Sequence, residues 1–417
     1  MTCRGLMQRL NDGEKVIVAE GYIFNFEKRC YVQAGPFVPT VVLEHPDLVK
    51  QSHEEFVRAG SDVVQAFTAS SYRYLITLFN KKKQYIWALG TLYYGHREKL
   101  KLIDRSADLE TLNRTALRIA RECATDTGTL MAGDICNTNT YNPANPSNRE
   151  KLEAIFKEQV EWAIEEGADF IVAETFGILD EALIALDVIK RYGKGNFHAF
   201  KYKPELPFYD FLLKENDNVS WMFLLTGVPA VTTIAVHNNL KDGVECTVDE
   251  VEVTEAMKRI ESAGADVVGL NCARGPDTML PLMEKIKKSG VKAHLAALPV
   301  TYRTTEKEPS FMNLTDPKTG KLAFPINLDC ALCPRDDIFE FGRRCDELGI
   351  NYVGLCCGNS PHYTRTLAES FGRKPPGSKF SPEMSLHCIF GTDEKVDKYL
   401  TTDAVENVLG RKNQSED

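Results

Sequence analysis

The sequence predicts an α/β fold, a (β/α)8 TIM barrel with two irregular insertions and a short C-terminal arm. Eight short apolar runs rich in β-branched residues recur along the chain, and helical patterns separate several of them. The same helix–glycine–aspartate–strand join also occurs three times. Eight βα units in succession are what a closed barrel requires.

The eight apolar runs are the candidate strands. They are Val16–Ala19, Val63–Thr68, Leu130–Asp134, Phe170–Glu174, Ala230–Val236, Val267–Cys272, Ala293–Leu298 and Tyr352–Cys356. Continuous apolar runs, in contrast to alternating ones, are typical of parallel strands buried on both faces. The carboxyl ends of these strands should form one rim, where such a barrel carries its chemistry.

Helices occupy the intervening segments wherever the pattern is clear. In Ser147–Gly167, Ser147 and Glu150 have capping-box spacing, an apolar stripe follows, and the final glycine suits a C-terminal cap. Pro46–Ala59 and Thr254–Ala263 are two further predicted helices, each followed closely by a glycine.

The joins between helices and strands repeat a short motif. Ala59–Asp62, Gly167–Asp169 and Ala263–Asp266 each place a glycine near the helix end and an aspartate just before the strand. The alternative to a barrel is an open doubly wound sheet, but no GxGxxG follows the first run. We therefore favour the barrel.

Two segments interrupt the regular spacing, and we expect both to be irregular insertions. They cover about residues 69–92 and 195–226, and neither shows helix or strand periodicity. We expect the barrel domain to span residues 1–372 and a polar, partly disordered arm to span residues 373–417.

The second insertion has ends that point to its origin. It begins Gly195-Asn196 and runs into Thr226-Gly227, pairs that G|GTAAT and ACAG|G can encode, the two ends of a phase-one intron. We hypothesise that this segment is a retained intron or a gene-model error, whereas the first insertion lacks such clean ends. Sequencing the transcript tests this, and a mature message that contains the segment would refute it.

The composition excludes several classes of protein. Of 417 residues, 43% are hydrophobic and 26% are charged, and 50 basic against 59 acidic side chains give a formal charge of −9. A nucleic-acid or anionic-membrane partner would require a basic surface, so we expect neither. Because the sequence begins without a signal-peptide pattern and contains no apolar run of about 18 residues, we expect a cytoplasmic protein.

Twelve cysteines without a secretory signal indicate thiols, a metal site or redox chemistry in place of a disulfide scaffold. Cys272 ends the sixth apolar run, and the adjacent Cys356 and Cys357 follow the eighth. Three thiolates on one barrel rim suit a zinc ion that keeps its fourth position open. Both adjacent cysteines can be ligands only if the chain turns there, which Gly358 permits.

The residues alone leave two alternatives open. The three cysteines could be ordinary buried core residues. A metal could instead bind Cys330-x-x-Cys333, whose spacing matches half of a zinc knuckle, although Pro334 follows it. A cysteine-based redox protein is disfavoured because no CxxC opens a helix.

Val-Gly-Leu-Asn-Cys-Ala at 268–273 and Gly-Leu-Cys-Cys-Gly at 354–358 resemble the zinc motifs of homocysteine S-methyltransferases. EGYIFNFEKRCYVQAGPF at 20–37 and VLEHP at 42–46 are similar to the betaine–homocysteine methyltransferases of that family. The resemblance covers about residues 5–367 apart from the insertions. It implies zinc-dependent methyl transfer from betaine, or a related onium donor, to homocysteine, which forms methionine.

The resemblance also implies roles for particular residues. Cys272, Cys356 and Cys357 would hold the zinc and carry the catalysis, with the homocysteine thiol, deprotonated by the metal, as the fourth ligand. The positions that match substrate-binding residues of the family are Glu20, Gly21, Phe37, Tyr94 and Glu174. Asn271 should support the substrate or the neighbouring metal turn. Family members assemble through C-terminal arms, so we expect a homo-oligomer.

The donor half of the site departs from the family pattern. Glu20 stands in place of an aspartate, Phe37 in place of a tryptophan and Thr175 in place of a tyrosine, while Gly177-Ile178 replace Glu-His. Aromatic faces hold a trimethylammonium group through cation–π attraction, so this weaker box leaves the donor open. The donor is betaine, or a smaller sulfonium such as S-methylmethionine or dimethylsulfonioacetate. The second hypothesis is a catalytically impaired relative that binds zinc or homocysteine without turnover.

Overall fold

The structure is a computed structural model that describes residues 4–79, 85–94, 100–138, 140–141, 147–194, 198–201, 212–214, 221–224, 227–387 and 391–393. The chain divides into two compact units, Met1–Pro375 and Pro376–Asp417. The described residues of the second unit form two short 3-10 helices, η5 (Pro376–Phe380) and η6 (Met384–Leu386). The disorder predicted for the end of the arm falls outside the described residues. No helix within the described ranges is long and apolar enough to span a membrane.

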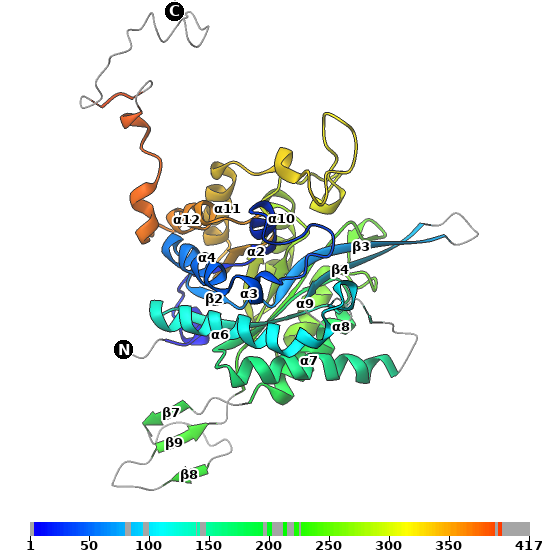
Figure 1. Ribbon diagram of the computed structural model, residues 1–417, viewed down its shortest axis with the longest axis vertical. Coiled ribbons are helices and arrows are strands. Elements are labelled where there is room, and N and C mark those ends of the chain that lie inside the picture. The colour runs from blue at the N-terminus through cyan, green and yellow to red at the C-terminus, as the bar shows by residue number, and fades with distance from the viewer. Residues whose placement is uncertain are drawn as a thin grey trace, which may run out of the picture. The chain divides into compact units, whose positions relative to one another are not determined.

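Eight parallel strands close into a barrel at the centre of the first unit (Figure 1). They are β1 (Val16–Ala19), β2 (Val63–Gln65), β5 (Leu130–Cys136), β6 (Phe170–Phe176), β10 (Ala230–Ile234), β13 (Val267–Asn271), β14 (His294–Leu298) and β15 (Tyr352–Leu355). The first and last strands pair from Val16↔Tyr352 to Ala19↔Leu355, which closes the ring. Each predicted run forms one of these strands, so the predicted barrel is confirmed.

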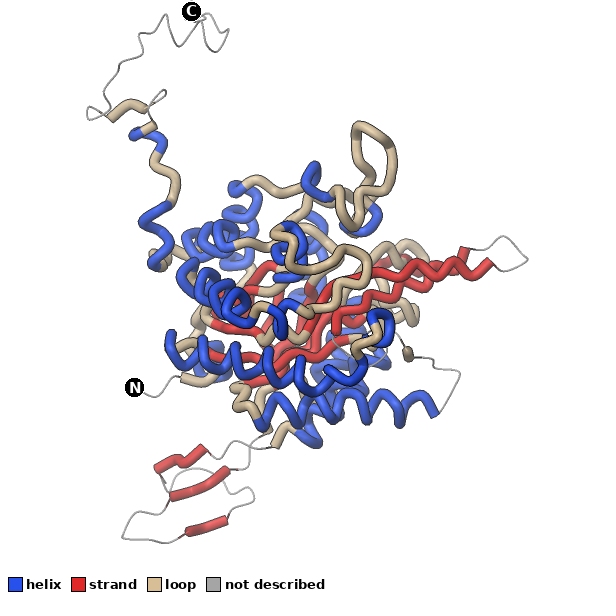
Figure 2. The backbone as a smooth tube through the Cα atoms, in the orientation of Figure 1, coloured by secondary structure: helices blue, strands red, loops and turns tan. Residues whose placement is uncertain are grey.

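The connecting helices surround the strands (Figure 2). They are α4 (Pro46–Ala59), α6 (Leu109–Thr127), α7 (Ser147–Glu165), α8 (Leu179–Tyr192), α9 (Val253–Ser262), α10 (Pro276–Lys288), α11 (Arg335–Glu347) and α12 (Pro361–Ser370). Three shorter helices, α1 (Leu6–Asn11), α2 (Tyr22–Lys28) and α3 (Val41–Glu44), precede or follow β1. The three helices predicted from the sequence are α7, α4 and α9, with ends that agree within two residues.

Alternate residues of the strands fill the barrel interior. The interior cluster contains Val16 and Val18 of β1, and Leu6 and Leu10 of α1 pack into the same cluster. Its other members are Val63, Leu130, Ala132, Phe170, Val172, Val231, Val267, Ala296, Leu298 and Tyr352. Residues between these, such as Ile17, belong to the larger core between strands and helices. The two-residue period therefore defines which side chains point inward at the strand ends.

The aspartates of the three repeated joins bind the preceding barrel strand in the same way. The Asp62 backbone N–H donates to the Ile17 carbonyl at 2.7 Å, and the Asp62 carboxylate accepts the Ile17 N–H at 2.8 Å. The same pair of bonds joins Asp169 to Met131 and Asp266 to Ala230. We call each of these arrangements a strand clamp. The clamps tie β1 to β2, β5 to β6 and β10 to β13 at the amino-terminal ends of the strands.

Each strand clamp is neutralised by a basic side chain. The carboxylate of Asp169 meets Arg121 at 3.1 Å, and that of Asp266 meets Lys190 at 2.9 Å. Asp62 is the most enclosed of the three aspartates and meets two arginines, Arg9 at 2.8 Å and Arg373 at 2.6 Å. The repeated sequence motif therefore has a structural role at the end of the barrel opposite the predicted chemistry.

The first insertion is not irregular, in contrast to the prediction. Its described residues form an antiparallel hairpin of β3 (Ala69–Phe79) and β4 (Tyr85–Tyr94), paired from Ala69↔Tyr94 to Phe79↔Tyr85. The segment is rich in residues with high β-propensity, and a hairpin needs no periodic burial against a core. Because β3 follows β2, the hairpin starts at the carboxyl-end rim of the barrel.

The second insertion also contains strands where its residues are described. β7 (His198–Lys201), β8 (Leu212–Lys214) and β9 (Trp221–Leu224) form a small antiparallel sheet in the order β7-β9-β8. At its base the Val228 N–H donates to the Gly193 carbonyl at 2.8 Å. The chain therefore leaves and re-enters the barrel at almost the same point, between α8 and β10.

Candidate active site at the carboxyl end of the barrel

A layer of buried polar side chains lies directly above the apolar interior of the barrel. Steps of two residues from the interior cluster lead to these inward positions at the strand ends. They are Glu20, Gln65, Asp134, Glu174, Asn271 and Cys356. Burial of so many polar groups in an apolar barrel costs stability, and such positions are typical of functional sites.

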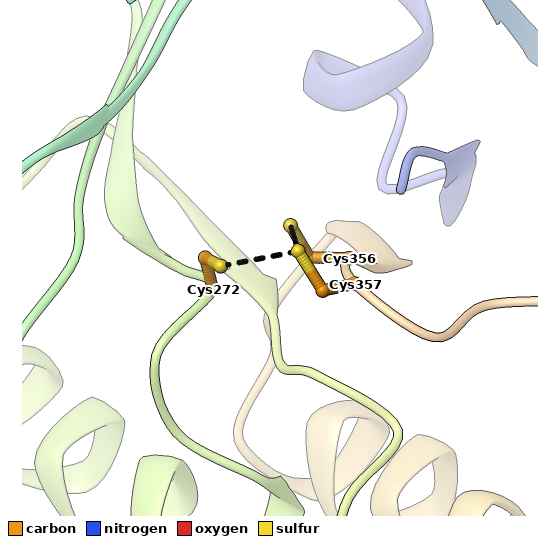
Figure 3. A group of neighbouring side chains, drawn as sticks. All are labelled: Cys272, Cys356 and Cys357. Atoms are coloured by element: carbon orange, nitrogen blue, oxygen red, sulfur yellow. Dashed lines mark hydrogen bonds between the residues drawn. The ribbon is translucent and has the colours of Figure 1, made fainter. Parts of the chain in front are cut away.

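The three predicted cysteines converge within this layer (Figure 3). Cys272 Sγ lies 3.6 Å from Cys357 Sγ, and Cys356 Sγ lies 4.0 Å from Cys357 Sγ. Ligands bound at about 2.3 Å to a tetrahedral zinc lie about 3.8 Å apart, so these spacings fit a single thiolate-bound ion. All three side chains are buried, and each offers one sulfur atom within 4.8 Å of the others.

A tight turn directs both adjacent cysteines to the site, as the sequence requires. The Asn359 N–H donates to the Cys356 carbonyl at 3.0 Å, which closes a β-turn with Cys357 and Gly358 at its centre. Gly358 has φ 85°, a left-handed conformation that glycine adopts without steric cost. The expectation that Gly358 allows the turn is confirmed.

Gly21 lies against the same turn. Its φ is 78°, and a Cβ at this position would be 2.3 Å from the Cys356 carbonyl oxygen and 2.8 Å from the Cys357 nitrogen. Real Cβ contacts are never this short, so a side chain at position 21 would displace the turn. Close backbone approach is therefore a structural reason for glycine here.

Two carboxylates lie beside the cysteines. One ligand atom each from Glu20, Glu174 and Cys356 gather within 4.8 Å of one another. Burial raises the pKa of Glu20 to about 8. Burial and the charge of Glu20 together raise the pKa of Glu174 well above its usual range. Both shifts favour the protonated form of these carboxyl groups when no cation lies beside them.

Asn271 holds Glu174 in place. Asn271 Nδ2 donates to Glu174 Oε2 at 2.7 Å, and Gln65 Nε2 donates to Glu174 Oε1 at 3.1 Å. Asn271 Oδ1 accepts the backbone N–H of Thr175 at 2.8 Å. Thr175 has φ 61°, which is strained for a β-branched residue, so the amide of Asn271 also fixes the bulge at the end of β6.

One pocket collects most of these groups. It is lined by Glu20, Gly21, Tyr22, Ile23, Gln65, Ala66, Phe67, Asp134, Glu174, Cys356 and Cys357. Gln65 and Asp134 are not among the site residues predicted from the sequence. Each is an amide or acidic residue in a run that is mainly apolar, and that exception is the signal that could have identified them.

The structure describes only one of the two aromatic side chains predicted to bind the donor. Phe37 is 1% exposed and lies in the hydrophobic core, where its ring centroid is 5.7 Å from that of Phe24. It is not among the residues that line the pocket described above. Tyr94 ends β4, but its side chain lies outside the described part of the structure, so its role stays a prediction.

The alternative metal site is not supported. Within the described ranges, the cysteine, histidine and acidic side chains close enough to hold a metal form two overlapping groups at the barrel rim. Neither group includes Cys330, which is exposed, or Cys333, which is buried.

Comparison with known proteins identifies the family. The model of the homocysteine S-methyltransferase family matches residues 21–371, which is most of the chain. The chain belongs to the homocysteine S-methyltransferase family. This family assignment confirms the resemblance predicted from the two cysteine motifs, and with it the enzyme class.

Individual members of the family are similar over most of their length. The chain is 30% identical to betaine–homocysteine S-methyltransferase 1 of Xenopus tropicalis, over 90% of this chain and 78% of that protein. It is 29% identical to S-methylmethionine–homocysteine S-methyltransferase BHMT2 of Pongo abelii, over 90% and 85%. The metallated form of the homocysteine methyltransferase MmuM from Escherichia coli has a similar fold, with TM-score 0.56, 12% identity and coverage of 87% and 99%.

Proposed function

We propose that this chain is a zinc-dependent methyltransferase that moves a methyl group from betaine, or a related onium donor, to homocysteine and forms methionine. The observation that carries the proposal is the convergence of three cysteine sulfur atoms with two buried carboxylates at the rim of a barrel of this family.

Cys272, Cys356 and Cys357 would hold the zinc. Their spacing fits a tetrahedral ion, and three protein ligands leave the fourth position for a substrate. When bound, zinc supplies the Lewis acidity that keeps the homocysteine sulfur deprotonated at neutral pH.

Glu20 and Glu174 would bind the amino group of homocysteine. Two adjacent buried carboxylates repel one another when both are ionised, and an ammonium group placed between them offsets that repulsion. The side-chain amide of Asn271 is already hydrogen-bonded to Glu174 and to the Thr175 backbone. We therefore assign Asn271 the role of positioning the substrate-binding carboxylate.

Methyl transfer needs few protein groups. The sulfur lone pair attacks the methyl carbon, a C–S bond forms, and the bond from that carbon to the donor nitrogen or sulfur breaks. The leaving atom takes the electron pair and becomes neutral, so no proton has to be delivered. The role of the protein is to align the two substrates and to exclude water from the buried site.

Methionine formation by the purified chain tests the proposal. Zinc-loaded protein is supplied with homocysteine and, in separate reactions, betaine, dimethylsulfonioacetate and S-methylmethionine. Turnover with betaine supports the main proposal, and turnover with the sulfonium donors alone supports the second candidate donor class. Binding of zinc and homocysteine without methionine formation from any donor would overturn the enzymatic proposal in favour of an impaired relative.

Glu174→Gln is expected to raise the KM for homocysteine about 10–100-fold, because a charged hydrogen bond to the amino group is lost. Zinc content should stay unchanged, since glutamine retains an acceptor for Asn271. Glu181→Gln is the matched control. Glu181 is also a buried carboxylate, but it accepts hydrogen bonds from Thr138, away from the cysteines. An unchanged KM in Glu174→Gln would contradict the assigned role.

Gly21→Ala is expected to reduce zinc affinity at least about tenfold, because the new methyl group displaces the Cys356–Cys357 turn. Gly13→Ala is the control, because Gly13 has φ 79° and no atom within 4 Å of a built Cβ. It therefore carries the same backbone strain without the clash. Equal zinc affinity in the two variants, measured by competition with a chelator, would contradict the expected displacement.

We also propose a cytoplasmic location and a homo-oligomeric assembly. The first is consistent with the lack of a spanning helix among the described residues, and the second with the C-terminal arm of the family. Sedimentation of the purified chain tests the assembly.

A further inference from the structure

The backbone that carries Cys272 is strained. Cys272 has φ 58° and the next residue, Ala273, has φ 57°, so two consecutive residues with side chains have positive φ values. The Arg274 N–H donates to the Cys272 carbonyl at 2.6 Å, across Ala273. A three-residue turn of this kind with a positive central φ is the rare and strained form of the γ-turn. We call residues 272–274 the Cys272 turn.

Backbone hydrogen bonds hold the Cys272 turn on the side of β14. The Ala273 carbonyl accepts the Phe311 N–H at 2.8 Å, and the Arg274 carbonyl accepts the Val300 N–H at 3.0 Å. Both donors lie in the connection between β14 and α11. A strained conformation persists only where the surrounding structure imposes it, and these two bonds supply part of that restraint.

The side chain of Arg274 holds the turn on the side of β10, the other neighbour of β13 in the barrel. Arg274 is 5% exposed. Its Nε donates to the Val236 carbonyl and its Nη2 donates to the His237 carbonyl, both at 2.9 Å. Both carbonyl groups lie just after β10. A guanidinium is a planar fork of donors in fixed directions, so it can join two successive carbonyl groups, whereas a lysine ammonium is a point charge on a flexible stem.

We propose that Arg274 is a positioning residue that holds the Cys272 turn in its strained conformation and thereby directs the Cys272 sulfur to the metal centre. This rests on the proposed function, because the direction of the sulfur matters only if Cys272 is a metal ligand. The turn brings Cys272 Sγ to 3.6 Å from Cys357 Sγ, which belongs to another strand end. Relaxation of the turn to negative φ values would redirect the Cys272 side chain away from the other two sulfur atoms.

A ligand that is held in place in advance favours metal retention, because less conformational freedom is lost when the metal binds. Partners that orient metal ligands typically change metal affinity about 10–100-fold. Arg274 is not among the residues that line the pocket with the two carboxylates. We therefore expect it to act on the metal through Cys272.

Zinc affinity, measured by competition with a chelator, tests the proposal. Arg274→Met has similar length and no donors, and it should lower zinc affinity about 10–100-fold. Arg274→Lys keeps the positive charge but not the fork, so it should lose nearly as much. Zinc affinity in Arg274→Met equal to that of the parent would overturn the proposal. Full affinity in Arg274→Lys would do the same, because it would show that charge and not position is what matters.

A glycine at position 273 separates strain from other effects. Glycine adopts a positive φ without steric cost, so a chain that carries Ala273→Gly needs less restraint on the turn. The loss of zinc affinity caused by Arg274→Met should therefore be at least about fivefold smaller in chains that carry Ala273→Gly. An equal loss in both backgrounds would overturn the role of Arg274 in holding a strained turn.

Arg9→Met is the matched control. Arg9 is also a buried arginine, 9% exposed, but it meets Asp62 and Glu14 at the amino-terminal end of the barrel. Its loss should lower thermal stability and leave zinc affinity unchanged. An equal loss of zinc affinity in Arg9→Met and Arg274→Met would attribute the effect to general destabilisation and overturn the proposal.

Cobalt substitution reports the geometry of the centre. Tetrahedral Co²⁺ has strong visible bands, which weaken when a ligand is displaced, so the bands of Arg274→Met should be weaker than those of the parent. Bands of parental intensity, together with a lower melting temperature, would show a packing role alone and overturn the proposal. A parent that binds zinc and forms no methionine contradicts the proposed reaction without affecting these comparisons of zinc affinity. A parent that binds no zinc overturns the metal centre, and this inference with it.

Discussion

Cys272→Ala is expected to lower the zinc content from about one ion per chain to near zero and to reduce methionine formation on the order of a hundredfold or more. Cys272 directly follows β13 and the other two sulfur atoms come from the turn after β15, so its removal leaves an adjacent pair on one short segment. Two thiolates from one turn cannot complete a tetrahedral set. Elemental analysis of purified protein and a methionine assay with the best donor measure the two effects.

Cys345→Ala separates loss of the centre from loss of a buried thiol. Cys345 is as buried as Cys272 but lies on α11, and it belongs to neither group of candidate metal ligands among the described residues. It should retain zinc and activity. Full zinc occupancy in Cys272→Ala would refute the three-cysteine centre, whereas loss of zinc from both variants would indicate general unfolding.

Asp62→Ala is expected to destabilise the barrel by about 3–5 kcal/mol, because it leaves two arginines without their shared buried partner. The Asp62 side chain is 10% exposed and accepts from Arg9, from Arg373 and from the Ile17 N–H. Arg9 is also largely buried, and without the Asp62 carboxylate it keeps Glu14, at 2.5 Å, as an acidic partner. Equilibrium unfolding in urea measures the free energy of unfolding.

The other strand clamps provide a graded comparison. The side chains of Asp169 and Asp266 are 34% and 31% exposed, and each meets one basic side chain. Their alanine variants should lose less of the free energy of unfolding, about 1–2 kcal/mol each. If Asp62→Ala lowered the free energy of unfolding no more than Asp266→Ala does, burial of the Asp62 ion pairs would not be what makes this clamp more stabilising. None of the three variants should change zinc affinity in the folded state.

Much of the fold follows from the sequence because it depends on local patterns. The strands of a barrel are buried on both faces, so each is a continuous apolar run and is recognisable without neighbours. The Gly358 turn is also predictable, since two adjacent cysteines can share one ion only if the chain reverses. The hairpin of β3 and β4 is not predicted because its sequence shows no clear strand or helix periodicity.

The site was partly predictable for the same reason. Cys272, Cys356 and Glu174 lie at strand ends, and the barrel brings all strand ends together. Gln65 and Asp134 could have been identified from the two-residue period of a strand. They lie two and four residues after the inward-facing Val63 and Leu130, respectively. The core position of Phe37 and the contact of Tyr302 with the cysteine turn depend on long connections, whose course no local pattern specifies.

The hydrogen bond that joins the two ends of the second insertion has a consequence for gene expression. The carbonyl of Gly193 and the amide of Val228 are already hydrogen-bonded, so a message that omits codons 195–226 would encode a chain needing only a short bridge there. The insertion joins a helix to the start of a strand, the side of the barrel away from the cysteines. A chain with the insertion and a chain without it should therefore have the same metal centre and the same chemistry.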